Sequence, residues 1–265
     1  LNSLITNAKE AGFFECSTFP VKSKVYIITV PTPIKKNNKP DLSYVKKATK
    51  SIIKLLEEGD LYIIESTSPV GTTDKMMRYI HKKRPDLKDK LFISYCPERV
   101  LPGNAIGEMI NNDRVIGGIN QRSTEKTISF YKKFIDGKLN CANAKTAEMC
   151  KLIENSSRDL QISFANELSI ICDEADIDVW ELINLANKHP RVNILTPGPG
   201  VGGHCIAIDP LFIISDFPNN SKIIKQARKT NDYKSKWCVN KILETINNFK
   251  DKNNIDPIVA FMGLT

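Results

Sequence analysis

Residues Leu61–Gly71 read LYIIESTSPVG, a short apolar run that passes directly into a polar loop. The run Leu61–Ile64 has the apolar, partly β-branched composition of a buried strand, and a helical pattern follows the loop to about Lys83. A buried strand, a connecting loop and a helix in this order form the repeating unit of an α/β protein. The stretch therefore predicts an α/β fold for the part of the chain around it.

The same kind of unit recurs on both sides of this stretch. Further strands are predicted at Val25–Val30, Leu91–Tyr95 and Arg114–Ile116, and further helices at Asp41–Glu58 and Thr124–Phe134. Asp41 is a suitable N-cap, and Gly59 is a suitable residue to end the helix that Asp41 begins. Strands that alternate with helices over short connections predict a Rossmann-like parallel sheet with helices on both faces.

Polar residues follow three of these predicted strands. Thr32 follows the first, Thr67 the second, and Glu98 with Arg99 the third. Ligands of parallel sheets bind at the carboxyl ends of the strands, so we expect these loops to share one binding edge.

The second half of the chain has a helical pattern. Ala144–Ala175 contains no glycine or proline and predicts a single helix of roughly 48 Å, long enough to bridge domains or to form a dimer interface. Helices are also predicted at Val179–Lys188 and Ile223–Phe249, and a final strand at Ile258–Phe261. The predicted fold is thus an incomplete Rossmann-like sheet followed by a helical domain built on a long central helix.

Thr196–Pro210, TPGPGVGGHCIAIDP, is too rich in glycine and proline for a regular element and predicts a shaped loop. Its glycines match the G-x-G-x-x-G pattern from Gly198 onward, but that pattern binds a dinucleotide only between a strand and a helix. The preceding residues do not form a convincing strand, and Pro199 lies inside the turn. We therefore interpret the segment as a catalytic or substrate loop.

Cys205 stands out because it follows two glycines within this loop and has His204 beside it. A thiolate is a competent nucleophile, and a neighbouring cation lowers the pKa of a thiol. On the predicted long helix, Lys151, Asn155 and Arg158 fall on one stripe. The spacing alone leaves open whether that stripe is functional or a solvated face.

Composition narrows the class of protein. The 265 residues carry a net charge of +8, with 41% hydrophobic and 26% charged residues, as in ordinary globular proteins. No apolar run predicts a membrane span or a secretion signal. The lysines are dispersed and only 8% of residues are aromatic, so an anionic small ligand is favoured over a nucleic acid. Seven irregularly spaced cysteines do not predict disulfides and favour the cytoplasm, and three scattered histidines do not predict a metal site.

Five motifs together carry a resemblance to a known family: VPTP, ESTSPVG, CPERVLPG, the segment Ala147–Leu168 and GPGVGGHCIAIDP. In this order, and over essentially the whole chain, they resemble the UDP-glucose/GDP-mannose dehydrogenase family. The resemblance implies an NAD-dependent, two-step oxidation of the C6 alcohol of a nucleotide-sugar to a carboxylate.

The resemblance also implies a domain organisation. Residues 1–142 would be the remainder of an NAD-binding domain, 143–250 a helical domain, and 251–265 the start of a nucleotide-sugar-binding domain. Members of the family begin with a strand, a glycine-rich loop and a helix, and end with a nucleotide-binding domain. Because this sequence starts at Leu1 and closes on an apolar run ending in Gly263-Leu264-Thr265, we expect it to be part of a longer protein.

Catalytic roles follow from the resemblance at matching positions. Cys205 would capture the aldehyde intermediate covalently, and Lys151 would act as acid/base or stabilise an oxyanion. Asn155 would supply a further hydrogen-bond donor, Asp209 would activate or position water, and Glu98 would assist the hydrolysis.

Binding roles follow in the same way. The residues expected to bind the nucleotide-sugar are Arg99, Val100, Lys151, Asn155, Arg158, His189, Arg191 and Gly202, and those expected near NAD are Thr32 and Thr67. The residues alone favour a different interpretation of Arg191, as a surface arginine after a helix-ending proline. The expected substrate is a UDP-N-acetylhexosamine, first of all UDP-N-acetyl-D-mannosamine, for cell-surface polysaccharide synthesis. We also expect a homodimer or higher homo-oligomer through the central helix.

Several alternatives stay open. The substrate could instead be UDP-N-acetylglucosamine, UDP-glucose or GDP-mannose. A cysteine-dependent hydrolase or acyltransferase would pair Cys205 with His189 or His204, but it leaves Lys151 and Asn155 unexplained. A non-catalytic fragment or dimerisation module built on the long helix is the third possibility.

Overall fold

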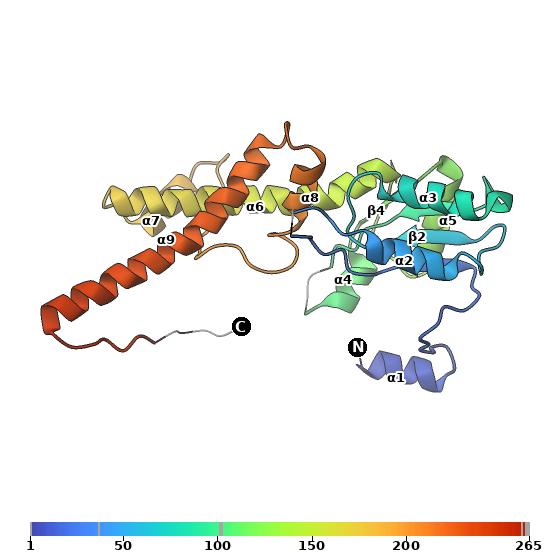
Figure 1. The fold of residues 1–265 in the computed structure, drawn as a ribbon, viewed down its shortest axis with the longest axis horizontal. Coiled ribbons are helices and arrows are strands. Elements are labelled where there is room, and N and C mark those ends of the chain that lie inside the picture. Colours follow the sequence, from blue (N-terminus) through green and yellow to red (C-terminus); the bar gives the residue numbers. More distant parts are fainter. Residues whose placement is uncertain (1, 37, 101–102, 261, 263–265) are drawn as a thin grey trace. The chain divides into compact units, whose positions relative to one another are not determined.

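The computed structural model describes residues 2–36, 38–100, 103–260 and 262. It consists of two compact units (Figure 1). Unit 1 comprises Leu1–Glu154 and Leu211–Pro218, and unit 2 comprises Asn155–Pro210 and Asn219–Thr265. None of the helices formed by the described residues is both long enough and apolar enough to cross a membrane.

Unit 1 is built on a five-stranded sheet with the strand order β1-β2-β3-β4-β5. The strands are β1 (Val25–Ile28), β2 (Leu61–Ile64), β3 (Phe92–Tyr95), β4 (Arg114–Gly118) and β5 (Leu139–Asn143). The pairs β1–β2, β2–β3 and β4–β5 are parallel, which confirms the predicted Rossmann-like α/β class.

The pair β3–β4 is antiparallel, so the prediction of a wholly parallel sheet is wrong at this point. Helix α4 (Ala105–Asn111), which lies between these strands in sequence, buries none of its residues. A parallel crossover requires a connection that packs across a sheet face, usually a helix with a buried side. Because α4 has no buried side, it does not act as such a crossover helix, and Ser94 and Tyr95 instead register with Gly118 and Gly117.

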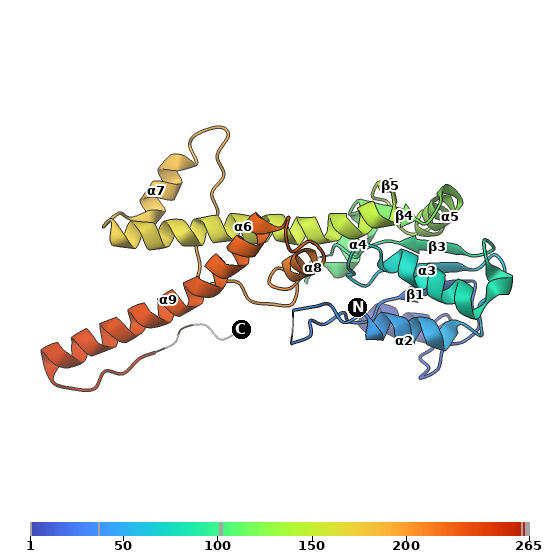
Figure 2. The same ribbon diagram turned by 45° about the horizontal axis from the view of Figure 1, so that its top comes forward.

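Both faces of the sheet are covered (Figure 2). Alternate residues of β2 point in opposite directions: Tyr62 and Ile64 join the core formed with α2 (Ser43–Ile52) and α3 (Thr72–Lys83). Leu61 and Ile63 join a second core with Tyr131 of α5 (Gln121–Tyr131). Burial on both faces explains why β2 reads as an uninterrupted apolar run.

Helix boundaries differ from the predicted ones where local capping decides them. The helix predicted for Asp41–Glu58 is shorter, since α2 begins at Ser43 and ends at Ile52, and a turn follows. Asp41 nevertheless accepts a 3.0 Å hydrogen bond from the N–H of Ser43. The helix α5 begins before the predicted Thr124, because the side chain of Asn120 caps the N–H of Ser123 at 2.8 Å.

The strand β5 was not predicted from the sequence. The sequence of β5, LNCAN, lacks the β-branched run that marked the other strands, and its strand character comes from pairing with β4 along five residues. A strand of this kind is specified by its neighbour in the sheet, which the local sequence does not reveal.

Unit 2 is helical. The predicted long helix is confirmed as α6 (Ala144–Glu174), whose residues from Asn155 onward belong to this unit. Two further helices of this unit are α7 (Val179–Ala186) and α9 (Lys222–Asn253), while α8 (Asp209–Asp216) begins in unit 2 and belongs to unit 1 from Leu211 onward. Within unit 2, α6 and α9 are joined by polar contacts, among them a 2.7 Å hydrogen bond from Lys234 to Ser169. Helix α1 (Asn2–Glu10), which belongs to unit 1, buries no residue.

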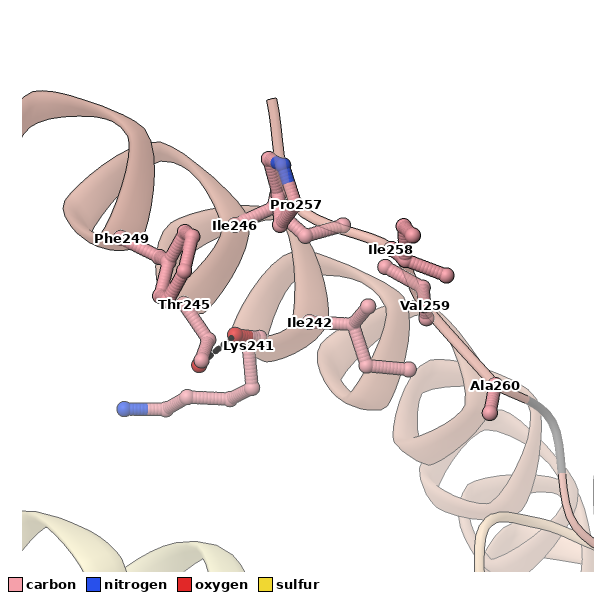
Figure 3. Close-up of a pocket in the computed structure, with 9 residues that line it drawn as sticks. All are labelled: Lys241, Ile242, Thr245, Ile246, Phe249, Pro257, Ile258, Val259 and Ala260. Carbon is pink, nitrogen blue, oxygen red and sulfur yellow. Dashed lines mark hydrogen bonds between the residues drawn. The ribbon is translucent and has the colours of Figure 1, made fainter. Parts of the chain in front are cut away.

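The strand predicted at Ile258–Phe261 is wrong for its described part. Residues Ile258, Val259 and Ala260 have irregular backbone, and Phe261 lies outside the described residues. A strand needs a hydrogen-bonded neighbour, and the sheet of the described residues contains only β1 to β5. Instead the segment runs beside α9 and lines an open, mostly apolar pocket together with Ile242 and Phe249 (Figure 3).

Candidate active site

The two units each contain part of the predicted site. Unit 1 contains Thr32, Thr67, Glu98, Arg99, Val100 and Lys151, and unit 2 contains Asn155, Arg158, His189, Arg191, Gly202, Cys205 and Asp209.

In unit 1, the loops that follow β1, β2 and β3 leave the sheet at one edge, because these three strands are adjacent and parallel. The backbone bonds continue past the strand ends: Ser66 donates to Ile28 O at 3.1 Å, and Cys96 donates to Ile64 O at 3.0 Å. Thr32, Thr67 and Glu98 therefore lie on loops of the same edge, as the strand pattern predicted.

Thr32 has a hydroxyl oxygen that is buried and makes no hydrogen bond within the described part of the chain. A buried polar atom normally has a partner, and an orphan of this kind at the carboxyl edge of a parallel sheet suits an oxygen-rich ligand. The residues present at this edge thus fit a dinucleotide such as NAD.

The loop after β3 is held by two acidic side chains. Glu98 accepts a 2.5 Å hydrogen bond from the N–H of Val100. Arg99 forms a two-point ion pair with Glu154 of α6, at 2.8 Å and 3.2 Å, and also donates to Asp113 O at 3.1 Å. The guanidinium of Arg99 is therefore already oriented by a carboxylate, a partner that the sequence did not indicate.

The loop after β2 is shaped by two carboxylates that the sequence analysis did not single out, the buried Glu148 and the partly buried Glu65. Glu148 of α6 accepts hydrogen bonds from Gly71 N at 2.5 Å and from both Thr73 N and Thr73 Oγ1 at 2.7 Å, so it caps α3. Burial raises the pKa of Glu148. At the other end of the loop, Glu65 is held by Arg114 at 3.3 Å and by the hydroxyl of Tyr131. Thr67 lies between these two anchors.

In unit 2, hydrogen bonds bring three predicted residues together. Asn155 Nδ2 donates to Asp209 Oδ2 at 2.6 Å, and Asp209 is only 3% exposed. The carbonyl of Cys205 accepts from the N–H groups of Ile208 at 3.1 Å and Asp209 at 2.9 Å. One tight turn therefore fixes Cys205 relative to Asp209, and Asn155 fixes that turn against α6. The thiol of Cys205 is exposed.

The remaining predicted residues of unit 2 are exposed. His189 Nδ1 accepts a 3.3 Å hydrogen bond from the N–H of Arg191, so these two residues share a turn after α7. The side chain of Asn187 closes the following loop by bonding both the N–H and the C=O of Ile194, at 2.7 Å and 2.9 Å. Arg158 lies on the exposed side of α6, and Gly202 in the glycine-rich loop.

A buried polar network between α6 and α9 was also missed by the sequence prediction. Asp159, Asn166 and Asn231 are each 0% exposed, and Arg228 is 5% exposed. Arg228 pairs with Asp159 at 2.5 Å. Burial raises the pKa of Asp159, and the charge of Arg228 opposes that effect. The bonded members of this network on α6 and α9 are 65 to 72 residues apart in the sequence, so local patterns do not indicate the network.

Comparison with known proteins identifies the family of this chain. Residues 1–135 match the model of the UDP-glucose/GDP-mannose dehydrogenase family, NAD binding domain, and residues 145–233 match the central domain of the same family. The chain belongs to the UDP-glucose/GDP-mannose dehydrogenase family.

Individual members of the family are similar to this chain over its whole length. The chain is 50% identical over 273 residues to the UDP-N-acetyl-D-mannosamine dehydrogenase of Campylobacter jejuni, and 50% identical over 275 residues to that of Escherichia coli K12. The alignments cover 100% of this chain and 66% of each relative, so the chain spans about two thirds of their length. Among solved structures, the UDP-N-acetyl-mannosamine dehydrogenase Cap5O from Staphylococcus aureus is similar, with a TM-score of 0.84 and 37% identity over 94% of this chain and 59% of that chain.

Proposed function

We propose that the protein containing this chain oxidises the C6 alcohol of UDP-N-acetyl-D-mannosamine to the carboxylate, with NAD as the oxidant and Cys205 as the covalent catalyst. The observation that carries the proposal is the turn that ties Cys205 to Asp209 and, through Asp209, to Asn155. It supports the proposal because a nucleophile, an acidic group and an amide donor are held together in unit 2. The relatives named above support the choice of substrate.

The chemistry divides into two oxidations and a hydrolysis. When bound, NAD accepts one hydride in each oxidation. The first oxidation converts the alcohol to an aldehyde with release of a proton. The Cys205 thiolate then adds to the aldehyde carbon while the carbonyl oxygen takes up a proton, which gives a thiohemiacetal. Loss of a second hydride and a proton leaves a thioester on Cys205. Water attacks the thioester carbon, the C–S bond breaks, and the carboxylate and the free thiol are released.

The other side chains take roles that match their chemistry. Lys151, an ammonium one helical turn before Asn155, receives or stabilises charge on the reacting oxygen, and Asn155 adds a hydrogen-bond donor. Asp209 positions the water that attacks the thioester, and Glu98 assists as a base.

Substrate and cofactor binding complete the proposal. Arginines suit a diphosphate because their forked donors match its oxygens, which supports Arg99, Arg158 and Arg191 as nucleotide-sugar ligands. The other proposed ligands of the nucleotide-sugar are Val100, His189 and Gly202, together with Lys151 and Asn155. Thr32 and Thr67 are proposed to contact NAD, supported by the orphan hydroxyl of Thr32.

Domain boundaries, assembly and compartment are also part of the proposal. The proposed domains are residues 1–142, 143–250 and 251–265.

A homodimer is supported by exposed apolar side chains on the helices of unit 2. Among them, Phe164 is 52% exposed, Ile171 is 53% exposed and Tyr233 is 54% exposed. Light scattering coupled to gel filtration tests it, and a monomeric mass contradicts it. A cytoplasmic location is supported by seven free thiols.

The test is the amount of NADH formed per mole of UDP-N-acetyl-D-mannosamine consumed by the complete gene product. The proposal expects two NADH per sugar, and a lower kcat/KM with UDP-N-acetylglucosamine, UDP-glucose and GDP-mannose. Cys205→Ala is expected to abolish formation of the carboxylate while binding of the nucleotide-sugar is retained. Turnover unaffected by Cys205→Ala removes the residue from the mechanism, and no NADH with any of these sugars overturns the proposal.

A further inference from the structure

The loop that carries Cys205 is attached to unit 2 upstream of the cysteine as well as downstream. Downstream, Asp209 is bound by Asn155. Upstream, the N–H of Gly198 donates to Asn166 Oδ1 at 2.9 Å, and the C=O of Pro199 accepts from Ser235 Oγ at 2.8 Å. Two consecutive residues of the loop are therefore each held through one backbone group, by one side chain of α6 and one of α9.

The upstream attachment continues into the buried network. Asn166 Nδ2 donates to Asn231 Oδ1 at 2.9 Å, and Asn231 Nδ2 donates to the Asp159 carboxylate at 2.8 Å and to the Asp159 backbone oxygen at 3.0 Å. The donor and acceptor roles at both ends of this series of hydrogen bonds are fixed chemically. The backbone carbonyl of Asp159 can only accept, and the N–H of Gly198 can only donate. The amide orientations of Asn231 and Asn166 are thereby determined, and Asn166 must present its oxygen to the loop.

The backbone of the loop is fitted closely to this attachment. Gly200 has a φ of +143°, a conformation that side chains rarely adopt. A Cβ at position 200 would also lie 2.1 Å from Ser235 Oγ. The backbone conformation thus favours glycine at position 200, and a Cβ there would displace the hydroxyl that holds Pro199. Further glycines between this point and Cys205 would let the loop move if the attachment were absent.

We propose that Asn166 and Ser235 are positioning residues, which hold Gly198 and Pro199 and so place the Cys205 thiol for attack on the aldehyde. The inference rests on the proposed function. A positioning role predicts an effect on only one of the two oxidations, whereas a general stabilising role predicts an effect on both. The reason is that Cys205 is needed only after the aldehyde has formed. Misplacing the thiol should slow the second oxidation and leave the first one intact.

The test compares Asn166→Ala and Ser235→Ala with the unmodified complete gene product. Lys236→Ala is the matched control, since Lys236 lies next to Ser235 on the same helix and is exposed. Each protein is given UDP-N-acetyl-D-mannosamine and NAD with hydroxylamine present to trap released aldehyde. Both positioning variants are expected to form fewer than two NADH per sugar, approaching one, with trapped aldehyde making up the difference. A second oxidation slowed by about 10-fold or more is expected for a thiol displaced by part of an ångström.

The control is expected to keep a ratio of two. A merely structural role for Asn166 and Ser235 would lower both oxidations together and leave the ratio at two, and that result overturns the proposal. Because Ser235 is exposed, Ser235→Ala is expected to fold, so it decides the question if Asn166→Ala is too unstable to purify.

Amide hydrogen exchange of the peptide covering residues 196–203 gives a readout that is independent of activity. Exchange is expected to be faster in both positioning variants than in the control. Asn166→Ala removes the partner of Gly198 N–H, and Ser235→Ala removes the partner of Pro199 C=O, so each variant loosens the loop. Unchanged exchange overturns the proposal whatever the activity. If the unmodified protein forms no NADH, the proposed function fails, while the exchange data still decide whether the attachment holds the loop.

Discussion

The side chain of Asn155, on α6, donates a 2.6 Å hydrogen bond to the buried carboxylate of Asp209, the residue that begins α8. Asp209 in turn donates its own N–H to the carbonyl of Cys205. A single amide side chain therefore supports both the acidic group and the turn that carries the proposed nucleophile.

Removing this amide is expected to impair catalysis. Asn155→Ala leaves Asp209 without this donor and frees the turn, so kcat for NADH formation should fall by about 10²-fold, the lower end of the scale for a positioned catalytic group. Ser157→Ala, at an exposed position two residues further along α6, serves as the control and should leave kcat unchanged. Equal kcat values for the two variants would show that the Asn155–Asp209 bond is not used in the reaction.

The proposed role of Lys151 can be separated from a general effect of lysines on α6. Lys151→Ala should lower kcat by at least ~10²-fold, because it removes a positioned acid/base. Lys145 lies on the same helix, is 65% exposed and pairs with Asp74 at 3.6 Å. An exposed pair of this kind contributes little, so Lys145→Ala should change kcat by less than about twofold. A near-normal kcat for Lys151→Ala would assign its stripe of α6 to a solvated face.

Thiol chemistry distinguishes Cys205 from Cys96. Burial raises the pKa of the Cys96 thiol to about 11, whereas Cys205 is exposed. At pH 8 the folded protein should therefore react with iodoacetamide at Cys205 at least ~100-fold faster than at Cys96, since the thiolate is the reactive form. Peptide mass spectrometry over a time course measures both rates, with the urea-unfolded protein as the control in which the two rates converge. Comparable labelling of both residues in the folded protein would contradict the buried position of Cys96.

The buried carboxylate of Glu148 predicts a pH dependence of stability. Because burial raises the pKa of Glu148 above its unfolded value, the folded state binds more protons between these two pKa values. The free energy of unfolding should then fall as pH rises through the raised pKa, with a slope of at most about 1.4 kcal/mol per pH unit for one group.

Urea unfolding of the unmodified protein and of Glu148→Gln between pH 4 and pH 8 measures this contribution. The variant lacks the titrating group, so the stability of the unmodified protein should decline relative to that of the variant with increasing pH. A difference that is constant, or that changes in the opposite direction, would show that Glu148 is not disfavoured as a charged group. Glu58→Gln, at a side chain that is 68% exposed, is the control and should leave the pH profile unchanged.

Much of the fold could be predicted because local patterns were strong. The apolar run of β2, the uninterrupted helical pattern of α6 and the glycine-rich loop before Cys205 each specify their own structure. The antiparallel pairing of β4 and the strand β5 could not be predicted in this way, because both depend on the neighbouring strand. The capping of α3 by Glu148, 77 residues from Gly71, was hidden for the same reason.

The sequence by itself determined which chemical groups the protein has and on which elements they lie: a cysteine in a glycine-rich loop, a lysine and an asparagine one helical turn apart, and polar loops after three parallel strands. These features follow from residue type and local periodicity. Only the tertiary structure decided how those groups are held. The bond from Asn155 to Asp209, the hydrogen-bond chain from Asp159 to Gly198 and the ion pair of Arg99 with Glu154 all join residues distant in sequence. Such partners are selected by burial, because a polar group taken out of water must find its hydrogen bond wherever the packed chain offers one.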